Sequence, residues 1–198
     1  EALLRDRITH KNDRFDSYIL VNEQATREAV IHGFRTHLSK AGADDVALFY
    51  YSGHGSQEPA PPEFWHLEPD RLDETLVCYG SRSPNGWDLA DKELAQLIFE
   101  VAAKHPHIVL ILDACHSGTI TRAAAEDKYS RVRLAPADTR LRPFETFIIS
   151  PEVIKSLAKK CPNDASIPGT TSYASDWFNL PIGQHLVLSA CRAEEEAK

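Results

Sequence analysis

Two unbroken apolar runs dominate the pattern of hydrophobic and polar positions along the chain. Residues 46–51 read Val-Ala-Leu-Phe-Tyr-Tyr, and residues 108–112 read Ile-Val-Leu-Ile-Leu. An uninterrupted run of this kind is typical of a strand that is buried on both faces of a parallel sheet. The pattern therefore predicts an α/β fold with these two strands side by side and parallel.

The remaining elements follow from shorter patterns. Apolar residues recur with a 3.6-residue period in residues 29–38 and 89–103, which predicts two helices, and Thr26 can cap the first of them. Pro151 can begin a third helix over residues 152–160. Further short strands are predicted at residues 18–21, 75–78 and 185–189, and a proline-rich loop at residues 58–70.

Composition narrows the class of protein. A chain of 198 residues with 42% hydrophobic and 26% charged residues is sufficient for one globular domain with its own core. The net charge of −7 and the lack of a Lys/Arg cluster argue against a nucleic-acid surface. No apolar run approaches the roughly 20 residues of a membrane span, and the pattern of residues predicts no signal peptide. We therefore expect a cytoplasmic protein with neither nucleic acid nor membrane among its partners.

The cysteines and methionines add two expectations. Cys78, Cys115, Cys161 and Cys191 form no CxxC pair and no zinc-binding pattern, which favours reduced thiols. The chain contains no methionine and begins with Glu1, so we expect it to be a piece of a longer protein.

Candidate chemistry stands at the ends of the two apolar runs. Cys115 follows the second run, and His54 lies between two glycines after the first. The carboxyl ends of parallel strands meet at one edge of a sheet, where ligands of α/β proteins bind. His54 could then act as the base that makes Cys115 a reactive thiolate. His116 is a second candidate base, but neighbouring residues tend to point apart.

The two motifs resemble those of a known family. Tyr-Ser-Gly-His-Gly at residues 51–55 and Asp-Ala-Cys-His-Ser-Gly at residues 113–118 resemble the catalytic motifs of the caspase-like cysteine peptidases, in particular the metacaspase and bacterial caspase-like branch of peptidase family C14. The resemblance implies a three-layer sandwich with a mostly parallel central sheet. It also implies that residues 1–198 are a single peptidase domain, incomplete because the first strand and the C-terminal element of the family are missing.

The resemblance assigns roles to particular residues. His54 and Cys115 would form a catalytic dyad that cleaves proteins through an acyl-enzyme intermediate. The oxyanion hole would consist of the backbone N–H groups of Gly55 and Cys115. His116 would then be structural.

Asp113 suggests the substrate preference. It precedes Cys115 by two residues, a spacing that returns a strand side chain to the same face. A carboxylate beside the nucleophile favours Arg or Lys before the scissile bond, as in the metacaspases. We expect Ser52, two residues before His54, to line the same pocket and Ser189 to form a wall of it. The alternative is that Asp113 caps the following turn.

A basic segment follows the nucleophile. Residues 122–142 are polar, and we expect them to be exposed and mobile, as proteolytic sites usually are. The resemblance implies a zymogen that is cut in this segment, by itself or by an upstream protease, and a regulatory domain is a further possible partner. The alternative is a solvated linker that is never cut. The basic residues are Arg122, Lys128, Arg131, Arg133, Arg140 and Arg142.

Metal binding and function class leave alternatives open. The chemistry requires no cofactor, but some metacaspases bind calcium through acidic residues after the histidine motif, where Asp73 and Glu74 are the candidate ligands. The alternative is that both are solvated in a surface loop.

The chain could also be a caspase-like interaction domain without turnover, or a different thiol acyl-transfer enzyme.

Overall fold

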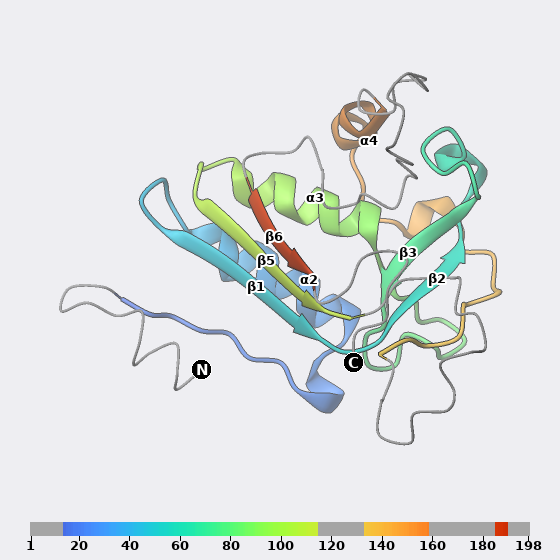
Figure 1. Ribbon diagram of the computed structural model, residues 1–198, viewed down its shortest axis with the longest axis horizontal. Coiled ribbons are helices and arrows are strands. Elements are labelled where there is room, and N and C mark those ends of the chain that lie inside the picture. Colours follow the sequence, from blue (N-terminus) through green and yellow to red (C-terminus); the bar gives the residue numbers. More distant parts are fainter. Residues whose placement is uncertain (1–13, 115–132, 159–184, 190–198) are drawn as a thin grey trace.

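A parallel three-stranded sheet forms the centre of the computed structural model, which describes residues 14–114, 133–158 and 185–189. Its strands are β1 (Val46–Ser52), β5 (His107–Asp113) and β6 (His185–Ser189), in the order β1-β5-β6. Both pairings are parallel, and Figure 1 shows the three strands side by side. The predicted α/β fold is thereby confirmed, as is the pairing of its two apolar runs.

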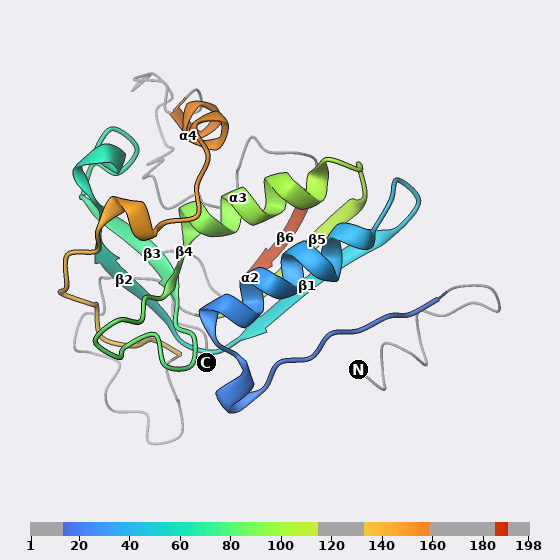
Figure 2. The same cartoon turned by 180° about the vertical axis from the view of Figure 1, so that it is seen from behind.

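Two helices, α2 (Arg27–Thr36) and α3 (Asp91–Ala102), cover one face of this sheet, as the views in Figures 1 and 2 show. The predicted cap of α2 is confirmed, since the Thr26 side chain accepts a hydrogen bond from the backbone N–H of Ala29 at 3.2 Å. Both helices present an apolar face to the strands, as their 3.6-residue period predicts. The core between the layers includes Ile31, Phe34, Ala47, Leu94, Leu97, Ile98, Val101, Ile108, Leu110 and Leu112.

A third helix, α4 (Pro151–Ala158), begins at the predicted proline and packs on α3 through Val153 and Ala95. In the described ranges, no helix covers the opposite face of the parallel sheet, so those ranges supply two layers. None of the described helices is long and apolar enough to span a bilayer. Short 3-10 turns occur at η1 (Asn22–Gln24), η2 (Leu38–Lys40), η3 (Pro62–Phe64) and η5 (Phe144–Thr146).

A second, antiparallel sheet lies beyond the carboxyl end of β1. It consists of β2 (Gly55–Pro59), β3 (Leu72–Leu76) and β4 (Leu89–Ala90), in the order β2-β3-β4. The first two residues of the loop predicted at residues 58–70 therefore belong to β2, and the strand predicted at residues 75–78 lies at Leu72–Leu76 instead. The sequence pattern misses β2 because this strand buries polar side chains, Ser56 and Glu58 among them.

The strand predicted at residues 18–21 is wrong. These residues have no regular structure, and Tyr18, Ile19 and Val21 are about half exposed. The Tyr18 ring packs on α2 instead, where a Cβ added to Gly33 would lie only 3.0 Å from it. A short apolar run resembles a strand in sequence, but here its aromatic side chain contacts a helix and its backbone joins neither sheet of the described chain.

Candidate active site

The carboxyl ends of β1 and β5 bring Ser52 and Asp113 together. The two residues are partners in the parallel register, and the Ser52 hydroxyl donates a hydrogen bond to Asp113 Oδ2 at 3.0 Å. Just beyond, the backbone N–H of Gly53 donates to the carbonyl of Asp113 at 3.3 Å. The edge expected to hold the site therefore carries a carboxylate and a hydroxyl in direct contact.

His54 lies in the short connection between β1 and β2, where it is exposed. Its backbone carbonyl accepts hydrogen bonds from the Tyr51 hydroxyl at 2.8 Å and from the Val77 N–H at 2.9 Å. Burial raises the pKa of Tyr51 well above its usual range, which keeps this hydroxyl protonated as a donor. The backbone of the candidate base is therefore fixed although its side chain faces solvent.

Gly53 is required for this arrangement. A Cβ at position 53 would lie 2.5 Å from the hydroxyl oxygen of Tyr51 and 2.7 Å from its Cζ. Any larger residue would displace the ring that holds the carbonyl of His54. The glycine before the histidine thus has a packing role that the sequence motif alone does not reveal.

Arg133, in the segment that follows the nucleophile, contacts Asp113 and Ser52 at the ends of β5 and β1. Its Nη1 lies 2.5 Å from Asp113 Oδ2 and donates to the Ser52 hydroxyl. Its backbone carbonyl accepts a hydrogen bond from the Gly55 N–H at 3.0 Å. Sequence reasoning counted Arg133 as one of several basic residues, and no local signal distinguishes it from the others. Asp113 thus pairs with a guanidinium.

Other expected site residues are not described in full. Cys115 and His116 lie outside the described residues. The backbone of Ser189 pairs with Leu112 at the end of β6, and its side chain is not described. Cys78 is a free, buried thiol, and burial raises its pKa to about 12. A thiol of that pKa is almost entirely protonated at neutral pH, so Cys78 is a poor nucleophile.

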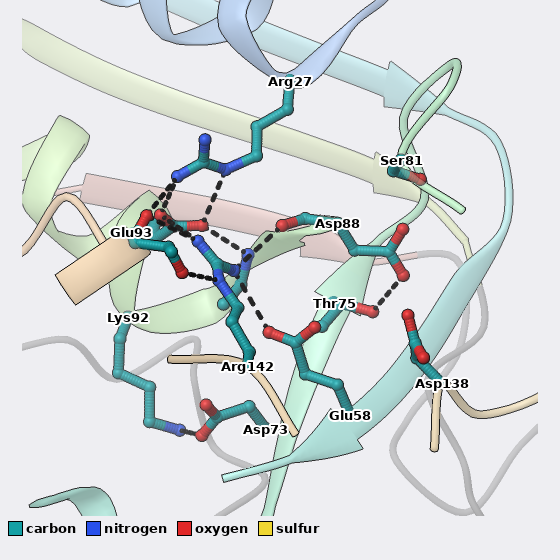
Figure 3. Close-up of polar contacts among 12 residues, drawn as sticks. Arg27, Glu58, Asp73, Thr75, Ser81, Asp88, Lys92, Glu93, Asp138 and Arg142 are labelled. Atoms are coloured by element: carbon teal, nitrogen blue, oxygen red, sulfur yellow. Dashed lines mark hydrogen bonds and ion pairs between the residues drawn. The ribbon is translucent and has the colours of Figure 1, made fainter. Parts of the chain in front are cut away.

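Arg142 and Arg140 depart from the exposed, mobile segment that the sequence predicts. Arg142 is fully buried and donates to Glu58 at 3.1 Å and to Glu93 at 2.8 Å, as Figure 3 shows. Arg140 pairs with Asp138 and donates to the backbone carbonyls of Ser81, Ser83 and Gly86. The expected exposure is wrong for Arg142, because buried carboxylates hold it inside the protein, whereas Arg140 keeps 30% of its side chain exposed while it binds Asp138 and the turn carbonyls.

Asp73 and Glu74 lie in a buried acidic cluster, and the alternative of a solvated loop is wrong. Both belong to β3, and their exposed fractions are 0% and 5%. The Lys92 ammonium lies among neighbouring carboxylates: it pairs with Glu68, with Asp73 at 2.8 Å and with Asp91 at 3.0 Å. Figure 3 shows Lys92 and Asp73 beside the Arg142 network.

The acidic cluster has the donor set of a hard cation. One oxygen each from Glu68, Glu74 and Asp91 lie within 4.8 Å of one another, and Glu74 Oε2 is buried without a hydrogen-bond partner in the described chain. Burial raises the pKa of Glu74 to about 7. Calcium prefers several carboxylate oxygens. The single positive charge of Lys92 is smaller in magnitude than the summed negative charge of the carboxylates around it. These residues therefore fit a calcium ion. Sequence reasoning missed Glu68 and Asp91, which only the fold brings to β3.

The fold and the site define an α/β protein whose polar groups converge beyond the carboxyl ends of parallel strands. The model of the metacaspase peptidase C14 domain matches residues 3–123. The chain therefore belongs to the metacaspase peptidase C14 family, as its two motifs predict. The parallel β1-β5-β6 sheet fits the caspase-like fold of that family.

Curated relatives agree with this assignment. Metacaspase III c of Phaeodactylum tricornutum is 30% identical over 95 residues, which cover 48% of this chain and 27% of that protein. Metacaspase-1 of Candida albicans is 25% identical over 96 residues, covering 48% and 21%, and Metacaspase-1 of Coccidioides immitis is 27% identical over 112 residues, covering 54% and 23%. The matches thus span about a quarter of each relative, and they support a cysteine peptidase function at the level of the family.

A solved structure also shows similarity. The crystal structure of a protein from Geobacter sulfurreducens matches with a TM-score of 0.46 and 32% sequence identity, and the match covers 59% of this chain and 40% of that chain.

Proposed function

We propose that this protein is a cysteine endopeptidase that cleaves proteins after Arg or Lys. The observation that carries the proposal is the guanidinium of Arg133, which contacts Asp113 and Ser52 at the edge of the sheet where the histidine motif begins. A carboxylate that binds an arginine of its own chain has the chemistry to bind an arginine of a substrate.

The proposed reaction uses the His54–Cys115 dyad. His54 takes the proton of the Cys115 thiol, and the thiolate adds to the carbonyl carbon of the basic residue. The N–H groups of Gly55 and Cys115 stabilise the oxyanion. The C–N bond then breaks, and His54 returns its proton to the leaving amine. Water finally hydrolyses the thioester, which regenerates the thiol and releases the new carboxylate.

The proposal includes a zymogen that is cut after the nucleophile, by itself or by an upstream protease. Its partners would be proteins with exposed basic residues and a regulatory domain that controls processing. The chain matches about a quarter of the length of each curated relative, so these partners are part of the proposal alone.

Calcium enters the proposal as a structural ligand, outside the thiol chemistry. Glu68, Glu74 and Asp91 would hold it, with Asp73 beside them. The ion would supply positive charge to buried carboxylates and so stabilise the β3–α3 region. Thermal unfolding with calcium or with a chelator tests this: calcium should raise Tm for the wild type but not for Glu74→Gln. Equal Tm values for the wild type under both conditions would refute it.

A peptide panel tests the main proposal. Purified protein is incubated with fluorogenic peptides that end in Arg, Lys or Asp, with Cys115→Ala as the control. Release of fluorophore from the Arg and Lys peptides alone, absent in the variant, is the expected result. No turnover of any peptide would favour an interaction domain. Turnover only when an acceptor amine is added would favour an acyltransferase.

A further inference from the structure

A groove lies between the loop that follows β2 and the segment that precedes α4. Residues 59–65 supply one wall and residues 141–145 the other, and the groove encloses about 320 Å³, a volume in the range of ligand-binding pockets. It begins at Pro59, the last residue of β2, whereas the histidine motif ends at Gly55, the first. At about 3.3 Å per residue, these two ends of β2 lie about 13 Å apart. The groove is therefore separate from the edge of the parallel sheet where the candidate active site lies.

The two walls are held rigidly against each other. Phe64 of the first wall is fully buried, and its ring packs edge-on against that of Phe144 in the second, with the ring centroids 5.4 Å apart. Prolines fix the backbone φ angle at several positions along both walls. A ligand therefore finds a preformed surface and binds without the entropic cost of ordering a loop.

Each wall exposes one large apolar side chain. Trp65 keeps 44% of its surface exposed and Leu141 keeps 82%. The indole Nε1–H of Trp65 donates to the carbonyl of Ala60 at 2.9 Å, and the guanidinium of Arg71 lies 4.4 Å from the ring centroid. These contacts fix the orientation of the ring although it faces solvent. Oriented, exposed aromatic side chains are typical of sites that bind an apolar group of a partner.

The side chains of the groove have no hydrogen-bond donor to spare. The indole N–H of Trp65 is engaged, and all five N–H groups of Arg142 have acceptors, which are the side chains of Glu58, Glu93 and Thr146 and the backbone carbonyls of Asp88 and Thr146. The prolines have no N–H at all; they are Pro59, Pro61, Pro62 and Pro143. An acidic or phosphorylated ligand would therefore meet no free cation among the residues that line the groove.

Acceptors, in contrast, are available on both walls. Glu63 lies on one wall and Glu145 on the other, and both are exposed. Neither carboxylate forms an ion pair with a cation of the described chain. The complementary ligand therefore has an apolar centre and a cation on each side of it. In a polypeptide, Arg and Lys supply such cations.

We propose that this groove binds an extended segment of a partner protein in which an apolar residue is flanked by Arg or Lys. The apolar side chain lies between Trp65 and Leu141, and the basic side chains pair with Glu63 and Glu145. This binding goes beyond the peptidase activity and does not require it, because no residue of the groove lies at the carboxyl ends of the parallel strands.

Titration calorimetry with the peptide Ac-Gly-Arg-Leu-Arg-Gly-NH2 tests the assignment. The protein carries Cys115→Ala, so that the peptide stays intact during the measurement. Replacing the Leu of the peptide by Ser, or both Arg by Glu, should each raise Kd by about tenfold or more.

Variants of the two apolar side chains test the same groove from the side of the protein. Trp65→Ala and Leu141→Ser should each raise Kd by about tenfold. Leu141 is so exposed that its replacement leaves the core intact, which keeps the test valid if Trp65→Ala fails to fold. Phe99→Ala is the matched control, since Phe99 on α3 has a similar exposed fraction of 42%, and it should leave Kd unchanged.

Charge reversal tests the expected preference for cations. Glu63→Lys combined with Glu145→Lys should weaken binding of the Arg peptide and strengthen binding of its Glu counterpart. Glu23→Lys, at another exposed position, should change neither Kd.

Four results would overturn the inference: no binding of the Arg peptide, equal affinity for the Arg and Glu peptides, binding that survives the groove variants, or binding that only Asp113→Ala abolishes. The last result would place the peptide at the end of β5. A dimer in sedimentation that Leu141→Ser dissociates would also overturn it, because a second copy of the chain would then occupy the groove. None of these results bears on peptide hydrolysis, which tests the proposed function separately.

Discussion

Ser52 and Asp113, 61 residues apart in the sequence, are register partners at the ends of β1 and β5 and share a hydrogen bond of 3.0 Å. The bond exists because the strands are parallel neighbours, so that their last residues lie side by side. The serine orients the carboxylate, and the guanidinium of Arg133 contacts both.

Substrate preference should depend on Asp113. We expect Asp113→Ala to lower kcat/KM for Arg-terminated peptides by about a hundredfold, because the substrate cation loses its partner. Ser52→Ala should cost only a few-fold, roughly the loss of one neutral hydrogen bond. Michaelis kinetics on Arg- and Gln-terminated peptides measure both effects, and the Gln peptide serves as the control. An Asp113→Ala enzyme that still prefers Arg would contradict the assignment.

Catalysis should require His54 and Cys115 together. His54→Ala and Cys115→Ala should each lower kcat by about three orders of magnitude or more, since a nucleophile and its base act as one unit. His116→Ala should have a much milder effect. Thermal melts of each variant show whether the fold is retained. A larger loss for His116→Ala than for His54→Ala would exchange their roles.

Stability should depend strongly on Arg142 and weakly on Arg35. Arg142→Met leaves the buried carboxylates of Glu58 and Glu93 short of a partner, and we expect a loss of about 3–5 kcal/mol in the free energy of unfolding. Arg35→Gln removes an exposed pair with Glu100 and should cost about 1 kcal/mol or less. Urea denaturation measures both. Equal, small losses would show that burial does not strengthen the Arg142 network.

Unfolding should show a pH dependence set by buried carboxylates. Burial raises the pKa of Glu58 and of Glu74 from 4.5 to about 7. Between these values the folded protein binds more protons than the unfolded chain, so stability should fall as pH rises from about 4.5 through 7. The expected slope is on the order of 1 kcal/mol per pH unit for each group.

The midpoint of urea denaturation, measured without calcium from pH 5 to pH 8, tests this slope. Glu74→Gln should flatten the pH profile and stabilise the protein at pH 8. Glu63→Gln, on an exposed turn, is the matched control and should leave the profile unchanged. A midpoint that rises with pH in the wild type would be the opposite of the expected sign.

The sequence by itself determined the parallel strands, the helices and the edge of the sheet at which Ser52 and Asp113 meet. The runs at residues 46–51 and 108–112 could be predicted as strands because their apolar character is local and continuous, but burial on both faces is wrong for β1, where Val46 and Tyr50 are exposed. Thr26 and Pro151 mark helix starts through their own side chains. The order of the two motifs, each directly after a strand, was enough to place His54 near the end of the strand that carries Asp113.

Only the tertiary structure decided which charges meet. Arg133 contacts Ser52 across 81 residues, and Arg142 contacts Glu58 across 84. A basic residue in a polar segment has the same local pattern whether it is solvated, buried or bound to a site. Which of these three environments a basic residue has depends on long-range electrostatics and on the topology that moves a carboxylate out of water. Neither can be predicted from the neighbouring residues.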